Sequence, residues 1–133
     1  MWVKEKPEYG DQIRVSRGLY YHHGIYQDDD CVYQFAVPGE ERDIDPDLAR
    51  VTTTTLEGFL RGGELEVRRY TEEEKKKKRS PLEIVQYAKD HLGEAGYNLL
   101  TNNCEHFSNR CVFDEPQRTQ VDDVFKRILE VFR

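Results

Sequence analysis

Short stretches in which apolar and polar residues alternate predict β-strands along the first third of the chain. Ile13 and Val15 alternate with polar neighbours at a period of two, which is typical of a half-buried strand. The β-rich segments 20–26 and 31–37 lie on either side of the acidic segment 27–30. Two such segments around a short polar turn predict a β-hairpin. We therefore expect an antiparallel sheet in this part of the chain.

Helical patterns dominate the second half of the chain. Ser80 and Glu83 have the spacing of a capping box, and Pro81 stands at the first helical position. Apolar residues follow at helical spacing up to Leu92, and Gly93 ends the helix. The pattern also predicts a helical turn over 56–60 ended by the glycine pair 62–63, a strand over 64–70, an extended piece over 97–100, a helix from 103 or 104 to about 112, and an amphipathic helix over 121–132.

Two segments lack a clear period. The acidic segment 38–54 is expected to be an irregular loop, and the charged run 71–79 a solvated loop or the frayed start of a helix. Strands that pair as hairpins, followed mainly by helices, are typical of an α+β fold. The sequence therefore predicts an α+β domain in which an antiparallel sheet packs against helices.

The composition is that of one folded domain. The chain has 133 residues, and its 11% aromatic residues are too many for a disordered chain. Its 20 basic and 26 acidic residues give a net charge of −6, which argues against a nucleic-acid partner. Neither a membrane-spanning apolar stretch nor the apolar core of a signal peptide is visible. Three cysteines leave at least one thiol unpaired, so we expect a soluble, cytoplasmic protein.

Cys104 carries the most chemical information in the sequence. Asn103 is a good N-cap, so Cys104 would be the first residue of a helix. Unpaired backbone N–H groups and the positive end of the helix dipole stabilise a thiolate there, and the same N–H groups can hold an oxyanion. Cys31 and Cys111 are expected to be ordinary buried cysteines.

A thiol nucleophile needs a base, and the base needs a group that orients it. His22 and His23 are neighbours in a predicted strand and point to opposite faces, so only one of them can meet Cys104. Gly24 shares the face of His22, and its missing side chain is expected to leave room for the cysteine helix. Gln34 is the only polar residue on its face of the next strand, which makes it the candidate to hold the imidazole of His22.

The sequence blocks around these residues resemble a known family. The segment 97–100, the run Asn103-Cys104-Glu105-His106-Phe107, the pair Gly10-Asp11 and the segment 21–26 are similar to motifs of the lecithin:retinol acyltransferase-like family. The resemblance extends from about Gly10 to Cys111. It implies a circularly permuted, papain-like (NlpC-type) fold for a catalytic domain over 1–113. Residues 114–133 would then form an amphipathic helical extension that packs on the domain or, through 121–132, on a protein partner.

The resemblance also implies an activity. Members of this family take an acyl group from a lipid ester as a thioester and pass it to water, an amine or an alcohol. Cys104 matches the family nucleophile and His22 its base, whereas Gln34 stands where animal members commonly carry a second histidine. His23 would replace His22 as the base if the strand register shifted by one residue. The implied partner is a phospholipid or another acyl lipid, reached by peripheral contact with a membrane.

Other readings of the same residues stay open. A cysteine peptidase or amidase of the NlpC or PPPDE type uses a similar arrangement, and a binding module could keep the fold without activity. No cofactor or metal is expected, because Cys104, His106 and Cys111 lack the spacing of paired zinc ligands. The acidic residues 43, 45 and 47 lack the glycine and glutamate of a calcium loop.

Overall fold

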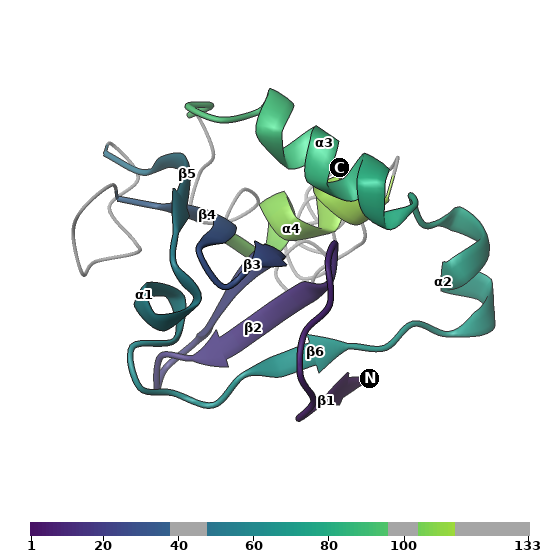
Figure 1. The fold of residues 1–133 in the computed structure, drawn as a ribbon, viewed down its shortest axis with the longest axis horizontal. Helices are drawn as coiled ribbons and strands as arrows, with labels where there is room; N and C mark the ends of the chain where they lie inside the picture. Colours follow the sequence, from purple (N-terminus) through teal and green to yellow (C-terminus); the bar gives the residue numbers. More distant parts are fainter. Residues whose placement is uncertain (38–47, 96–103, 114–133) are drawn as a thin grey trace, which may run out of the picture.

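A computed structural model of the chain describes residues 1–37, 48–95 and 104–113. Within these residues a six-stranded sheet has the order β1-β6-β2-β3-β4-β5, and its neighbouring strands pair antiparallel. The strands are β1 (Trp2–Val3), β2 (Gln12–Ser16), β3 (Tyr21–Asp28), β4 (Cys31–Ala36), β5 (Arg50–Thr54) and β6 (Glu66–Arg68). The helices are α1 (Leu56–Leu60), α2 (Glu72–Lys77), α3 (Pro81–Asp90) and α4 (Cys104–Val112). The predicted α+β class is confirmed, and Figure 1 shows the arrangement of the elements.

The predicted hairpin of β3 and β4, together with β2, forms the centre of the sheet. In the β2–β3 pair, Val15 lies opposite His22 and Ile13 opposite Gly24. In the β3–β4 pair, Gly24 lies opposite Gln34. Because successive side chains of a strand point to opposite faces, His22 and Gly24 share one face of β3 and His23 lies on the other.

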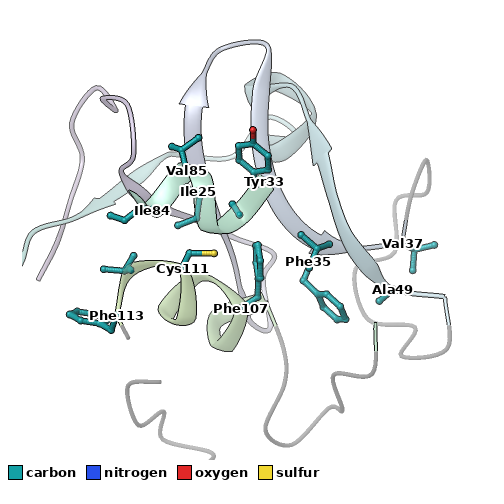
Figure 2. Close-up of a cluster of buried hydrophobic side chains, with 13 residues drawn as sticks. Ile25, Tyr33, Phe35, Val37, Ala49, Ile84, Val85, Phe107, Cys111 and Phe113 are labelled. Atoms are coloured by element: carbon teal, nitrogen blue, oxygen red, sulfur yellow. The ribbon is translucent and has the colours of Figure 1, made fainter. Parts of the chain in front are cut away.

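Helices cover both faces of this sheet. One buried cluster joins α3 and α4 to Ile25, Tyr33 and Phe35 of the central hairpin (Figure 2). A second cluster joins Phe59 of α1 to the opposite face, through residues such as Val32. Since both faces are covered, the strands carry few exposed positions. Gln12 is completely buried, although the alternation predicts a half-buried strand with a polar outer face.

Three expectations for local structure need correction. The segment expected to be irregular up to Thr54 contains the strand β5, because its β-branched residues extend the sheet beside β4, with Val51 opposite Phe35. The charged run contains the helix α2, which begins with a capping box formed by Thr71 and Glu74. The strand expected over 64–70 spans only Glu66–Arg68.

The helix boundaries follow the capping signals. Thr55 caps α1, and Ser80 and Glu83 form the predicted capping box of α3. The helix α3 ends earlier than expected, with His91 as its C-cap, and Leu92 is 48% exposed instead of lying on the apolar face. The predicted extended piece 97–100, the N-cap Asn103, the acidic residues 43–47 and the predicted helix 121–132 lie outside the described residues. Among the described helices, none is long and apolar enough to cross a membrane.

The space beside Gly24 is occupied by α1. A Cβ at this position would lie 2.7 Å from Cε2 of Phe59, 2.9 Å from the carbonyl oxygen of Tyr33 and 3.1 Å from Cγ1 of Val32. The expectation that this space receives the cysteine helix is therefore wrong. The helix α4 instead packs with Ile25, on the opposite face of β3.

Gly24→Ala should destabilise the fold by about 1–3 kcal/mol, because the added methyl group overpacks this site. Alanine also restricts the unfolded chain, but the stability gained in this way is smaller than the cost of the overpacking. Denaturant unfolding measures the change. In a Phe59→Leu background, which removes the nearest ring atom, the cost of the same substitution should be smaller. A Gly24→Ala protein as stable as the wild type would contradict the packing described here.

Candidate active site

The predicted helix that begins at Cys104 is confirmed as α4. Cys104 is half-buried and packs against the cluster between α4 and the sheet. Its Sγ donates a hydrogen bond to the carbonyl oxygen of Tyr21 at 3.6 Å. The thiol therefore lies at the first turn of α4, against the peptide that joins Tyr21 to His22.

The other two cysteines do not share this position. Cys111 is completely buried in the core, and its burial raises the pKa of its thiol far above the usual range. Cys31 is half-buried and packs at the edge of the same cluster. The expectation that Cys111 is an ordinary buried cysteine is confirmed.

His22 and Gln34 contact each other directly. The Nε2 atom of His22 lies 2.8 Å from Oε1 of Gln34, and the imidazole is fully buried beside the ring of Phe59, with 4.9 Å between the ring centroids. An amide oxygen only accepts hydrogen bonds, so Nε2 carries the proton in this arrangement. In the neutral tautomer of this arrangement, Nδ1 is the basic nitrogen that a general base requires.

Of these candidates, the structure brings His22 and Gln34 into direct contact and places Cys104 apart from them. Gln34 and His22 meet on the face of the sheet that α1 covers, whereas Cys104 packs on the face that α4 covers. The peptide between Tyr21 and His22 lies between the thiol and this pair, because the thiol contacts the carbonyl oxygen of Tyr21 and the imidazole belongs to the next residue. The thiol and the candidate base thus lie at the same end of β3.

His23 lies on the face of β3 that α4 covers. The strand register does not have to shift to place it there. Its Nε2 atom is 3.9 Å from Oε2 of Glu105, and its ring packs edge-on against Trp2. Burial is the main cause that lowers the pKa of His23 to about 3, and the neighbouring His22, Arg14 and Arg68 contribute to the same shift. At neutral pH, His23 is therefore uncharged, its contact with Glu105 is not an ion pair, and it is a weak base.

A buried network of polar side chains attaches α4 to the sheet. Nε2 of Gln12 donates to Oγ of Ser108 and to Oδ1 of Asn109, both at 2.8 Å. Arg68 donates to Oε1 of Gln12 at 3.1 Å and to Oδ1 of Asn109 at 3.0 Å, and the hydroxyl of Tyr70 donates to Oε1 of Gln12 at 3.2 Å. Every polar atom of the Gln12 amide is thus paired inside the protein, which fixes α4 against β2 and β6.

Sequence reasoning missed this network. Gln12 reads as the polar side of a half-buried strand, and no role was predicted for Asn109. The sequence around Asn109 carried no signal for this network, because its partners Gln12 and Arg68 lie on the distant strands β2 and β6. Arg79 adds a further contact, because its Nη1 donates to the carbonyl oxygens of Arg110, Cys111 and Phe113 at the end of α4.

Among the described residues, no cluster of histidine, cysteine or acidic side chains is arranged to hold a metal ion.

Comparisons with known proteins identify relatives over most of the chain. The model of the family described as Lecithin retinol acyltransferase matches residues 5–117. Lecithin retinol acyltransferase of Rattus norvegicus is 28% identical over 143 residues, which cover 93% of this chain and 62% of the relative. Phospholipase A and acyltransferase 5 of Homo sapiens is 32% identical over 129 residues, which cover 90% of this chain and 45% of the relative.

A shorter relative matches over most of its own length. Phospholipase A and acyltransferase 3 of Mus musculus is 30% identical over 135 residues, which cover 92% of this chain and 81% of the relative. The chain thus spans between about half and two thirds of the length of the first two relatives and most of the length of the third.

The lowered pKa of His23 predicts a loss of stability in acid. The unfolded chain binds a proton at this histidine below about pH 6.5, whereas the folded protein resists protonation down to about pH 3. Stability from this group is therefore complete above pH 6.5 and decreases as the pH falls, by up to about 1.4 kcal/mol per pH unit. Denaturant unfolding between about pH 6.5 and pH 4.5 should show a smaller decrease for His23→Leu than for the wild type. Parallel curves for the two proteins would contradict the assignment of a neutral, buried His23.

Proposed function

The chain belongs to the lecithin retinol acyltransferase family, and we propose that it is a thiol-dependent acyltransferase or phospholipase A-type enzyme that acts on an acyl lipid. The observation that supports this most directly is the position of Cys104. Its thiol stands at the start of α4, on the carbonyl oxygen next to the buried pair of His22 and Gln34. A helix start lowers the pKa of a cysteine, and an adjacent imidazole can accept its proton.

The proposed reaction has two halves. His22 accepts the proton of Cys104 at Nδ1, and the thiolate attacks the carbonyl carbon of a lipid ester. The new C–S bond forms, the C–O bond breaks, and the proton returns from His22 to the departing alcohol. Water, an amine or an alcohol then attacks the thioester with His22 as the base, which releases the acyl group and restores the thiol.

Two features of the site support these steps. The backbone N–H of Cys104 belongs to the first turn of α4, where the helix leaves N–H groups for an oxyanion, and Asn103, predicted from the sequence to be the N-cap, belongs to the same proposed support. Gln34 orients the imidazole without adding charge, because its amide is neutral. Proton transfer requires the thiol and Nδ1 to come within hydrogen-bond reach, about 3 to 4 Å. His22 is preferred over His23 because His23 is too weak a base at neutral pH.

The fold, the domain boundaries and the location of the chain are part of the same proposal. We assign residues 1–113 to a catalytic domain with a circularly permuted papain-like (NlpC-type) fold and 114–133 to a C-terminal amphipathic extension that packs on the domain or on a protein partner. A phospholipid substrate requires peripheral contact with a membrane. The three cysteines are free thiols, which fits a cytoplasmic location.

Cys104→Ser should abolish transfer of the acyl group, because the hydroxyl group is a much weaker nucleophile than the thiolate. The measurement is the intact mass of the protein after mixing with phosphatidylcholine vesicles, together with the fatty acid released. The wild type should gain the mass of one fatty-acyl group, whereas Cys104→Ser should gain none and release fatty acid only at the background rate.

The control for this experiment is Cys31→Ser, which changes a half-buried thiol away from the site. It should acquire the same acyl group as the wild type. If the wild type formed no adduct and released no fatty acid, the lipid substrate would be wrong, and peptide substrates or a binding role would become the better explanations.

Gln34→Leu should lower kcat by about tenfold or more with little change in KM, because the imidazole of His22 loses the contact that holds it in place. Gln34→His supplies another ring that can accept from Nε2 and should restore most of the rate, with a second titrating group visible in the pH profile. Thr53→Ala, on the neighbouring strand, is the control and should leave both parameters unchanged. Equal kcat values for Gln34→Leu and the wild type would show that Gln34 does not position the base.

A further inference from the structure

Two consecutive hydrogen bonds lead from the strand β2 to the first turn of α4. Nε2 of Gln12 donates to Oγ of Ser108 at 2.8 Å, and this hydroxyl donates to the carbonyl oxygen of Glu105 at 3.0 Å. Glu105 directly follows Cys104 in the helix. We refer to these two hydrogen bonds as the Gln12–Ser108 relay. The relay connects a strand residue to a backbone carbonyl one residue after the candidate nucleophile.

The relay has only one possible direction. Ser108 has a single hydroxyl hydrogen and the carbonyl oxygen of Glu105 can only accept, so the hydroxyl donates to Glu105 and accepts from Gln12. The amide of Gln12 must therefore turn its NH2 group toward α4. Arg68 at 3.1 Å and the hydroxyl of Tyr70 at 3.2 Å donate to Oε1 of this amide and require the same orientation.

The guanidinium that fixes this amide is itself held in place. Nη2 of Arg68 donates to Oε2 of Glu74 at 2.6 Å, and Oε1 of Glu74 accepts from the backbone N–H of Thr71 in the capping box of α2. Gln12 and Ser108 are both 0% exposed. Because solvent does not reach either side chain, water does not readily replace a partner that the relay loses.

Ser108 and Cys104 lie on the same side of α4, one turn apart. A spacing of four residues corresponds to a rotation of about 40°, so a rotation of the helix moves both side chains together. The thiol itself contacts the sheet through a hydrogen bond of 3.6 Å to the carbonyl oxygen of Tyr21, and a thiol is a weak donor. A displacement of about 1 Å at a reacting group can lower a rate by about a hundredfold. The rotation set by the relay is therefore a quantity to which a reaction at the thiol is sensitive.

We propose that Gln12 and Ser108 are positioning residues for Cys104: their hydrogen bonds set the rotation of the first turn of α4 and hold the thiol where it can attack a lipid ester. This inference rests on the proposed function, because it assigns both residues to the same reaction. Both act through the helix, without a role in proton transfer or in lipid binding. Loss of the relay should therefore slow the reaction without weakening the binding of the substrate.

The test removes the hydroxyl at the centre of the relay. Ser108→Ala keeps the hydrogen bond between Gln12 and Asn109, so α4 stays attached to β2. This variant should lower kcat for the release of fatty acid from phosphatidylcholine vesicles by about tenfold or more, with a change in KM below about twofold. Thermal unfolding verifies that the variant is folded at the temperature of the assay.

The matched control is Cys111→Ala. It removes a completely buried sulfur from the same helix and leaves the relay intact. The control should lower the unfolding temperature to a similar extent as Ser108→Ala, because both variants lose buried interactions of α4. Its kcat should stay within about twofold of the wild type, since the rotation of the first turn is unchanged.

A second readout does not require a substrate. The alkylation of Cys104 by iodoacetamide, followed as the mass of its peptide, reports the ionised fraction of the thiol at each pH. Because the relay holds the thiol at the helix start, the pH of half-maximal alkylation should rise in Ser108→Ala toward that of a free cysteine, about 8.5. Gln12→Met breaks the relay from the strand side and should give the same shift, whereas Cys111→Ala should give none.

The remaining outcomes decide against the proposal. A wild-type kcat in Ser108→Ala would overturn it, and so would alkylation profiles identical to that of the wild type. Equal losses of kcat in Ser108→Ala and Cys111→Ala would overturn it as well, because they would reflect stability alone. Should Ser108→Ala fail to fold, the same comparisons with Gln12→Met decide.

The two readouts separate this inference from the proposed function. A wild type that releases no fatty acid would refute the enzymatic proposal. The alkylation profiles would then decide whether the relay positions the thiol. A shift in Ser108→Ala that is absent from Cys111→Ala would support the positioning role, and equal profiles would refute it.

Discussion

The attachment of α4 to the sheet is the interaction on which the candidate site depends. Cys104 is the first residue of α4, so its position follows from the way the rest of that helix is held. Phe107 and Cys111 pack it into the core, and Gln12 fixes its rotation through Ser108 and Asn109. Apolar packing alone allows a helix to slide or rotate at small cost, whereas a buried amide must keep all its partners. The hydrogen bonds therefore set the direction in which the helix start points.

The strand β3 connects the parts of the site. Its first residue, Tyr21, accepts the hydrogen bond of the thiol, and the next residue, His22, carries the candidate base. Nucleophile and base are thus arranged along one short stretch of β3, a strand that pairs with β2 on one side and with β4 on the other.

The two adjacent histidines show how environment separates chemically identical groups. Both are buried, but Gln34 provides an acceptor for the imidazole of His22, whereas His23 lies among aromatic and basic groups that disfavour its protonation. The ring of His22 thus has a polar side-chain partner that orients it, whereas the ring of His23 is held mainly by packing.

Much of this molecule was determined by the sequence itself. The capping residues Ser80 and Glu83, the position of Cys104 at a helix start and the alternation of β2 to β4 are local signals, and each acts over a few residues. The pairing of His22 with Gln34 also follows from alternation and a short hairpin. The tertiary structure decided what lies above each face: Phe59 occupies the space beside Gly24, α4 covers the side of His23, and Gln12 becomes a buried anchor. Local patterns could not show this, because the choice of face depends on contacts between residues almost a hundred positions apart. An alternating pattern separates the two faces of a sheet but does not indicate which helix covers which face.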